Sequence, residues 1–353
     1  MMRRTRAGVV AALALALALA ACSAKQPEAV TVTASPDTSV SKVAPPAPVI
    51  PAKPIVWPLT GVRTDAVAHR PALAIKVENA REARPQTGLE FADVVWEQTV
   101  EGGITRFVAV YQSQIPAAVE PVRSVRPMDA GIVAPLGGIL AFSGGQAGFV
   151  SDVKAAGVQV VSMDAGNAGF RRDRARRAPH NVIGTPQTFL DQAHADRKSP
   201  PPAQFAFADP GKSTAETTGT PAAHLTVTFS RVQQTVWDWD GGTGTYLRSD
   251  GTVPSVSSAG TRLKARNVVL LKVRLQNTGT VDPAGNPVPE TVMVDSGEGV
   301  VAAAGKSVLV HWSKASTAAP LVLTTADGKP VELEPGNTWV ELVPNTTGSW
   351  AIS

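Results

Sequence analysis

Apolar and polar positions follow two different patterns along this chain, and the change between them divides it in two. In the first part, short apolar runs alternate with segments of helical composition. The predicted strands are 72–77, 94–98, 105–111, 138–143 and 158–162. The predicted helices are 147–156, which ends before Gly157, and 185–195, which Thr185 and Pro186 open. This alternation predicts an α/β (α+β) domain with a mixed sheet over residues 57–198.

From residue 224 onward the pattern changes to short alternating strands separated by turn residues. The predicted strands are 225–229, 235–239, 246–248, 268–274, 308–312, 321–324 and 338–342. Turn signals include Asp240-Gly241, Asp250-Gly251 and Asp327-Gly328. The pattern predicts an all-β, sandwich- or barrel-like domain over residues 224–353. Its tryptophans are expected to pack in the core, since that is the usual place for large aromatic side chains.

Between these parts, residues 199–223 are rich in Pro, Thr and Ala and have little apolar periodicity. We interpret the segment as a linker or long loop between two separately cored domains. Phe205 and Phe207 alternate with other residues and could add an edge strand.

The N-terminus has the order of a secretory signal peptide, predicted over residues 1–21. Arg3, Arg4 and Arg6 precede an apolar run of 15 residues that ends at Cys22, the only cysteine. The run is shorter than the ~20 residues that span a bilayer. The order Leu-Ala-Ala-Cys resembles the lipobox of bacterial lipoproteins, in which the cysteine becomes the lipidated first residue. That resemblance implies an exported protein, anchored by lipid on the outer face of the cytoplasmic membrane. An ordinary signal peptide with an incidental Cys22 is the alternative.

Residues 22–56 are predicted to be a disordered tether, because they are rich in Pro, Ala, Ser, Thr and Val and contain no aromatic residue. About 30 such residues have a typical reach of about 30 Å.

Charge and cysteine content narrow the classes of function. The formal net charge is +4, and removal of the three signal-peptide arginines lowers it to +1. This gives no electrostatic case for a nucleic-acid partner. A single cysteine cannot form a disulfide within the chain, so an exported domain must rely on its cores. The abundance of Ala, Gly and Pro is typical of a GC-rich bacterial genome.

Residues whose side chains could bind a ligand or take part in catalysis are concentrated in two predicted loops of the first part. Residues 97–106 combine two glutamates, two glycines and an arginine, and residues 171–181 combine five arginines, an aspartate and a Pro-His-Asn end. The guanidinium group of arginine can donate two parallel hydrogen bonds to a carboxylate or phosphate group. Loops on a rigid scaffold often contain the functional residues of a protein. The candidate ligand-binding residues are Arg84, Glu97, Glu101, Arg106, Arg123, Arg126, Arg172, Asp173, Arg174, His180 and Asn181.

The alternative is that these charges form structural ion pairs, or that 171–177 is a solvated loop. His180 could act as a general acid or base, or simply hydrogen-bond its loop. No cofactor or metal is expected. The histidines do not have metal-ligand spacing, and neither Gly305-Lys306-Ser307 nor Gly211-Lys212-Ser213 has the earlier glycine that a phosphate-binding loop requires.

Several ordered motifs beyond residue 56 resemble the YerB-like bacterial lipoproteins, a family defined by a domain of unknown function with N- and C-terminal parts. The matching segments are Trp57–Gly61, Ala83–Leu89, Ala92–Glu97, Val100–Phe107, Pro121–Arg126, Arg172–Asn181, Asn267–Val269, Trp312–Lys314 and Leu333–Trp339. The resemblance covers nearly all of the chain after Val56. It implies the fold of that family and a location at the cell envelope, but it implies no particular activity.

Taken together, these patterns predict a membrane-tethered protein that binds an anionic envelope ligand, such as a wall precursor, polymer or peptide. An enzyme, either a hydrolase or a transferase acting on wall material, is the less favoured alternative, and a protein–protein adaptor is a third. A cleft that holds His180 within hydrogen-bond reach of a carboxylate would favour the enzyme. An arginine-lined pocket without such a pair would favour binding.

Overall fold

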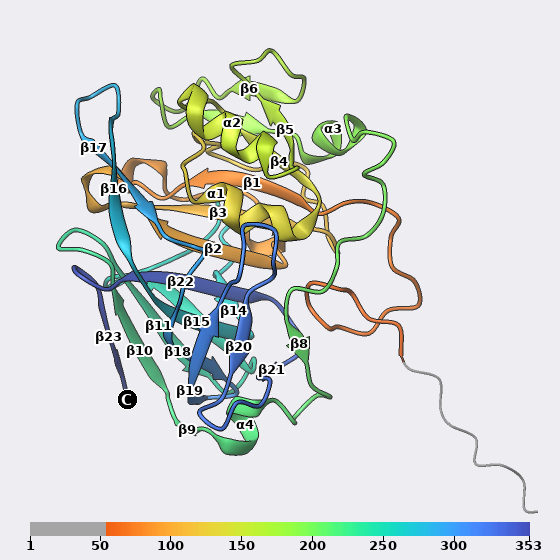
Figure 1. Cartoon of the computed structure of the whole chain (residues 1–353), viewed down its shortest axis with the longest axis vertical. Coiled ribbons are helices and arrows are strands. Elements are labelled where there is room, and N and C mark those ends of the chain that lie inside the picture. The colour runs from red at the N-terminus through yellow and green to blue at the C-terminus, as the bar shows by residue number, and fades with distance from the viewer. Residues whose placement is uncertain (1–53) are drawn as a thin grey trace, which may run out of the picture. The chain divides into compact units, whose positions relative to one another are not determined.

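The computed structural model describes residues 54–353, all of which lie in one compact unit (Figure 1). The predicted signal peptide, Cys22 and all but the last three residues of the predicted tether lie outside the described residues. Among the residues described, no helix is both long enough and apolar enough to cross a membrane.

The first part of the chain forms short strands and helices close to the predicted positions. The strands are β1 (Leu73–Glu78), β2 (Val94–Thr99), β3 (Thr105–Tyr111), β4 (Ile139–Phe142), β5 (Gln159–Ser162), β6 (Phe170–Arg172) and β7 (Val182–Gly184). The α-helices are α1 (Asp129–Val133), α2 (Ala147–Ala155) and α3 (Pro186–Asp191). Short 3-10 helices are η1 (Arg81–Ala83), η2 (Leu89–Phe91), η3 (Glu101–Gly103) and η4 (Ala134–Leu136).

The rest of the chain is almost entirely β, as its alternating pattern predicts. The segment predicted to be a linker contains β8 (Ala206–Phe207), α4 (Thr214–Thr218) and β9 (Thr220–Pro221). The following strands are β10 (His224–Thr228), β11 (Gln234–Asp240), β12 (Thr245–Asp250), β13 (Val253–Pro254), β14 (Lys264–Ala265), β15 (Asn267–Val273), β16 (Leu275–Val281) and β17 (Pro287–Thr291). The last are β18 (Ser296–Ala303), β19 (Lys306–Ser313), β20 (Val322–Thr324), β21 (Glu332–Leu333), β22 (Thr338–Pro344) and β23 (Ser349–Ile352).

One mixed sheet of eleven strands runs through both parts of the chain, in the order β20-β19-β18-β15-β22-β2-β3-β1-β4-β5, with β9 paired to β19. Strand β22 joins the two parts, because it lies parallel to β15 on one side and to β2 on the other. Figure 1 shows β22 between the orange strands of the first part and the blue-green strands of the second. A one-residue shift of β22 would move every side chain to the opposite face, so its register is strongly constrained.

The large sheet is buried on both faces. Val94 and Trp96 belong to one hydrophobic cluster, whereas Val95 between them belongs to the other. Helices α1 and α2 contribute to the first cluster through residues such as Val133 and Phe149. A six-stranded sheet, β13-β12-β11-β10-β23 with β14 beside β12, packs into the second cluster. The second region is therefore strand-rich and layered, and its described residues form no closed barrel.

The expectation of two separately packed cores is wrong, because both clusters contain residues from both parts. The predicted linker is also packed against its surroundings. Ala215 on α4 is fully buried, and Phe207 on β8 pairs with Leu333 on β21. The proposed domain limits themselves stay a prediction. Among the tryptophans of the second part, Trp237 and Trp339 lie edge to face in the core, as the sequence predicts.

Candidate functional site

One cavity of about 540 Å³ is lined by five of the predicted site residues. We call it the arginine cavity. Its lining includes Glu78, Asn79, Arg81, Glu82, Arg84, Glu101, Gly102, Arg106, Arg123 and His180 from the first part of the chain. The β10–β11 turn adds Val232 and Gln233, and the β16–β17 turn adds Asp282 and Asn286. The cavity is therefore built by both parts of the chain.

Backbone pairing at the end of β1 brings these residues together. Glu78, the last residue of β1, lies opposite Arg106 on β3. The backbone N–H of Arg123 donates to the carbonyl of Lys76, so the segment after Pro121 runs beside the same end of β1. Val122 in turn donates to the carbonyl of Val182 at the start of β7, which places His180 nearby. Residues about 100 positions apart thus meet at one edge of the sheet.

Glu78 is the centre of a three-residue contact. Its buried carboxylate lies 3.1 Å from Nε of Arg123 through Oε1 and 2.9 Å from Nδ1 of His180 through Oε2. The second ring nitrogen of His180 has no hydrogen-bond partner among the described residues. The contact fixes the orientation of both cationic side chains at the cavity lining.

Arg106 is the least satisfied charged group in the lining. Only 5% of the residue is exposed. Nη1 donates to the carbonyl of Ser124 at 3.2 Å, and Nη2 lies 3.8 Å from Oε2 of Glu101. Its Nε has no hydrogen-bond partner. Burial lowers the pKa of Arg106 to about 9, and the positive charges of Arg126 and Arg123 act in the same direction. Arg106 remains charged at neutral pH, in an environment that opposes that charge.

Glu101 compensates part of this charge, although it is shared. Arg126 donates from Nη2 to Glu101 Oε2 at 2.8 Å, so Glu101 already has a close partner. Glu101 sits on η3, where Gly102 and Gly103 adopt φ values of 69° and 75°. Both values lie in the left-handed region, which favours glycine. This turn explains why two glycines follow the glutamate.

Formal charges of the arginines and carboxylates in the lining are balanced, although the arginine-rich loops predicted a site for an anion. Four arginines face four carboxylates: Arg81, Arg84, Arg106 and Arg123, with Glu78, Glu82, Glu101 and Asp282. The charged groups of the lining differ, however, in how many of their hydrogen bonds are already made. Glu78 and Glu101 have close cationic partners, and Asp282 accepts bonds from its own turn. Arg123 and Arg84 are themselves paired, with Glu78 and Asp250, which leaves Arg106 as the buried cationic group whose hydrogen bonds are incomplete.

A buried ion pair lies beneath this edge of the sheet. Lys76 Nζ lies 2.8 Å from Asp129 Oδ1, and both side chains are fully buried. Burial lowers the pKa of Lys76 to about 8, while Asp129 opposes the shift. Asp129 also accepts from Gln98 and from the backbone N–H of Arg126. These bonds hold the start of the 126–129 turn beside β1 and β2.

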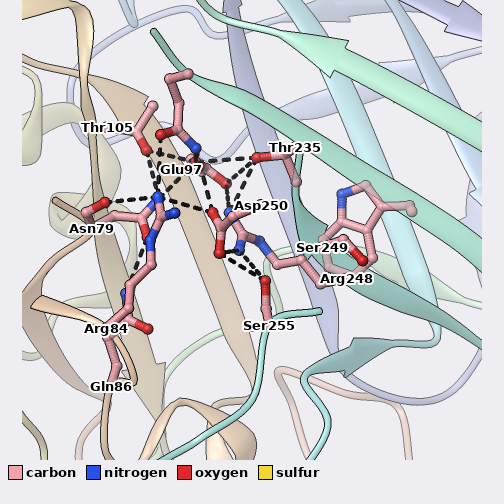
Figure 2. A network of polar contacts seen from close by, with 12 residues as sticks. Asn79, Arg84, Gln86, Glu97, Thr105, Thr235, Arg248, Ser249, Asp250 and Ser255 are labelled. Atoms are coloured by element: carbon pink, nitrogen blue, oxygen red, sulfur yellow. Dashed lines mark hydrogen bonds and ion pairs between the residues drawn. The ribbon is translucent and has the colours of Figure 1, made fainter. Parts of the chain in front are cut away.

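Glu97 is fully buried and belongs to a polar network that adjoins the cavity, shown in Figure 2. Arg248 lies 2.9 Å from Glu97 through Nη2 and 2.9 Å from Asp250 through Nη1. Arg84 lies 3.0 Å from Asp250 and also lines the arginine cavity. Burial alone would lower the pKa of Arg248, but Asp250 and Glu97 outweigh it and raise that pKa above its usual value. Glu97 and Arg248 thus tie the large sheet to the six-stranded sheet.

A second carboxyl group adjoins this network. Glu341 on β22 lies beside Glu97 on β2 in the sheet register, and Trp237 donates to its Oε1 at 2.9 Å. Burial and the charge of Glu97 raise the pKa of Glu341 well above its usual value. The folded protein therefore favours the protonated form of Glu341.

We expect Glu341→Gln to stabilise the protein at pH 8 relative to the parent. An unfolded glutamate loses its proton near pH 4.3, whereas folded Glu341 keeps it to a higher pH. The free energy of unfolding of the parent therefore falls as the pH rises above about 4.3, because unfolding releases the proton of Glu341. Glutamine does not titrate, so the variant lacks this contribution to the pH dependence. Urea titrations at pH 4 and pH 8 check this. A variant that loses as much stability at pH 8 as at pH 4 would contradict the assignment.

The loop of residues 171–181 is held mainly by its own contacts. Arg172 donates to Oδ1 of Asn181, whose side chain in turn donates to the carbonyl of Asp173. Arg176 donates to the carbonyl of Ala83, which docks the loop against η1.

The structure therefore brings together only part of the predicted set. Arg84, Glu101, Arg106, Arg123 and His180 line the arginine cavity, and Arg126 lies behind it on Glu101. Glu97, Arg172, Asp173, Arg174 and Asn181 do not line it. For Glu97 and Asp173, the prediction of a shared concave region is wrong, since Glu97 is fully buried and Asp173 caps its own loop through Ala175.

Sequence reasoning missed Glu78, Asn79 and Arg81, as well as the turns from the second part. The available signal for Glu78 is a charge at the end of a buried strand whose other residues, apart from Lys76, are apolar. Within residues 54–353, no group of three or more His, Cys, Asp or Glu side chains is arranged to hold a metal ion.

Comparisons with known proteins match most of the chain. The model described as "Protein of unknown function (DUF3048) N-terminal domain" matches residues 59–199, and that of the DUF3048 C-terminal domain matches residues 225–340. The putative lipoprotein YerB of Bacillus subtilis (strain 168) is 26% identical over 302 residues, which cover 83% of this chain and 88% of YerB. The crystal structure of YerB from Bacillus subtilis matches with a TM-score of 0.71 at 24% identity, over 84% of this chain and 99% of that one. The resemblance predicted from the sequence motifs is confirmed.

Proposed function

The chain belongs to the DUF3048 family of proteins of unknown function, and we propose that it is a lipid-anchored envelope protein that binds an anionic ligand in the arginine cavity. The observation that carries the binding proposal is Arg106. It is nearly buried, it lines the cavity, and its Nε has no partner. A buried guanidinium in this state loses hydration without full compensation. An anion in the cavity would compensate the charge of this guanidinium.

The neighbouring groups are arranged to assist such an anion. Arg123 and His180 are held in place by Glu78 and also line the cavity. Charge-assisted hydrogen bonds from arginine are short and directional, so a few of them can orient a phosphate or carboxylate. The candidate ligands at an envelope are wall precursors, wall polymers and peptides with such groups.

Binding is tested by measuring the melting temperature of the fragment 54–353, which contains the whole described unit and matches the extent of the crystallised relative. We expect methyl phosphate to raise this temperature at constant ionic strength, while added chloride leaves it unchanged. A ligand that binds only the folded state stabilises by about 2.7 kcal/mol at one hundred times its Kd. No difference between phosphate and chloride would contradict the proposal.

The membrane anchor is proposed from the lipobox-like end of the signal sequence and from the name of YerB as a putative lipoprotein. We expect Cys22→Ala to abolish incorporation of labelled diacylglycerol and to release the protein from membranes, since two acyl chains suffice for stable anchoring. Fractionation and fatty-acid labelling of the full chain check this. Unchanged labelling in the variant would contradict lipidation at Cys22.

A second candidate function, a hydrolase or transferase, is favoured by the feature that the sequence analysis named for an enzyme, a histidine within hydrogen-bond reach of a carboxylate in a cleft. His180 lies in the cavity with Nδ1 2.9 Å from a carboxylate oxygen of Glu78, an arrangement that orients a histidine for general acid–base work. If this is its role, the protein should release p-nitrophenol from p-nitrophenyl phosphate, and His180→Gln should remove that activity while methyl phosphate still binds. Equal rates in the parent, the variant and buffer would leave binding as the function.

A further inference from the structure

We propose that the ligand is a phosphate monoester of a single hydrocarbon chain, with the phosphate in the arginine cavity and the chain in a second cavity beside it. This inference rests on the proposed function of the arginine cavity and adds the chemical class of the ligand. Its basis is the continuity of the two cavities and the contrast between their linings.

The second cavity lies beneath the β16–β17 hairpin and measures about 420 Å³. We call it the hairpin cavity, and it is lined by residues that include Val100, Glu101, Gly102, Leu275, Pro287 and Pro289. Glu101 and Gly102 line both cavities. A Cβ atom built on Gly102 would meet no other atom within 4 Å. The two cavities therefore adjoin, and Gly102 faces open space and adds no side chain between them.

The two linings differ in chemistry. Glu101 is the only charged residue in the lining of the hairpin cavity, and Arg126 already binds its carboxylate. Val100, Leu275 and two prolines supply apolar surface, whereas the arginine cavity presents arginines and a histidine. A ligand that matches both has a charged head and an apolar extension. Each methylene that is fully buried raises affinity about fourfold.

The roof of the hairpin cavity is held without a ligand. Gln146, just before α2, donates from Nε2 to the carbonyl of Val281 at 3.0 Å, which ties the hairpin to the first part of the chain. Asp282 closes the hairpin turn by accepting from the backbone of Ala284 and Asn286. A preformed cavity binds a chain without the cost of ordering its walls.

Exposed apolar side chains flank this region. Val232 in the β10–β11 turn is 66% exposed and lines the arginine cavity, and Val281 next to Asp282 is 58% exposed. Val232 sits on a turn, where polar residues are the norm, and Val281 is the last residue of β16. Apolar tips beside a charged cavity are consistent with a ligand whose chain emerges toward a lipid surface.

The separate origins of the cationic side chains favour phosphate over carboxylate. Arg106 comes from β3, Arg123 from the segment after Pro121, and His180 from the loop before β7. The two oxygens of a carboxylate are well matched by the planar guanidinium of a single arginine. A phosphate monoester carries three strong acceptor oxygens, so it can accept from several directions at once.

Calorimetric titration of fragment 54–353 with methyl phosphate and hexyl phosphate tests the inference, because the two share a head group and differ by five methylenes. We expect hexyl phosphate to bind at least tenfold more tightly. Leu275→Gln should reduce this advantage at least threefold and leave methyl phosphate unchanged. The matched control is Leu309→Gln, since Leu309 is 75% exposed on β19 and lines neither cavity. The comparison of the two ligands in the parent does not depend on any variant.

The outcomes separate the two proposals. If methyl phosphate binds and hexyl phosphate binds equally, the hydrocarbon inference is overturned and the anion site stands. If neither phosphate binds, the proposed function itself is overturned. Tighter binding of dihexanoyl phosphatidic acid than of hexyl phosphate would assign the site to a two-chain phospholipid and overturn the single-chain proposal. Equal binding of hexanol and hexyl phosphate would show that the arginine cavity takes no part.

Discussion

Arg248→Met is expected to lower the free energy of unfolding by about 3–5 kcal/mol at pH 7, the cost of removing one partner from a buried ion pair. Both carboxylates that Arg248 binds, Glu97 and Asp250, are buried, so the variant leaves two negative charges without their main partner. Typical domains are stable by about 5–15 kcal/mol, so this is a large fraction of the total. Urea unfolding measures the loss.

The matched control is Arg274→Met, because Arg274 pairs with Asp295 at the surface. An exposed pair of this kind contributes about 0–1 kcal/mol. The loss in Arg248→Met should also shrink toward pH 4, where the unpaired carboxylates take up protons. Similar losses in the two variants would show that the network of Figure 2 does not hold the two sheets together.

Arg106→Gln is expected to weaken methyl phosphate binding at least tenfold and to leave the melting temperature of the ligand-free protein unchanged or higher. Burial lowers the pKa of Arg106, which means that the folded state disfavours its charge. At pH 7, well below that pKa of about 9, the charged side chain therefore costs stability. Glutamine removes the cost, and it also removes the donors that an anion would use.

Arg63→Gln is the control for this prediction, since Arg63 is exposed and lines none of the cavities described above. Its binding of methyl phosphate should equal that of the parent. If Arg106→Gln instead unfolds at a much lower temperature and binds phosphate normally, Arg106 has a structural role only.

Local patterns predicted the elements of this fold well. The apolar run 72–77 became β1, and the segment 147–156 became α2, because each pattern reports a periodicity that the chain satisfies on its own. The position of β22 between β15 and β2 could not be predicted in this way. Its pairing with β2 joins residues more than 240 positions apart, and no local periodicity encodes such a contact. The same insertion explains why the two parts share their cores.

The candidate site was predictable in part for a similar reason. Arg106, Arg123 and His180 stood out because they are charged or titratable residues in loops, and they do meet in one cavity. Glu97 has the same local signature, yet Arg248 from β12 covers it, and that partner is 151 positions away. Burial of a charge by a distant strand cannot be inferred from the sequence around the charge. The contribution of the β16–β17 turn to the lining of the arginine cavity was not predicted for the same reason, since that turn is distant in the sequence from the other lining residues.

A crystal structure of fragment 54–353 grown with methyl phosphate tests the central claim most directly. The account predicts phosphate in the arginine cavity, with one oxygen within hydrogen-bond distance of the Arg106 guanidinium and others reached by Arg123 or His180. Phosphate bound elsewhere, with the Arg106 side chain solvated by water alone, would contradict it.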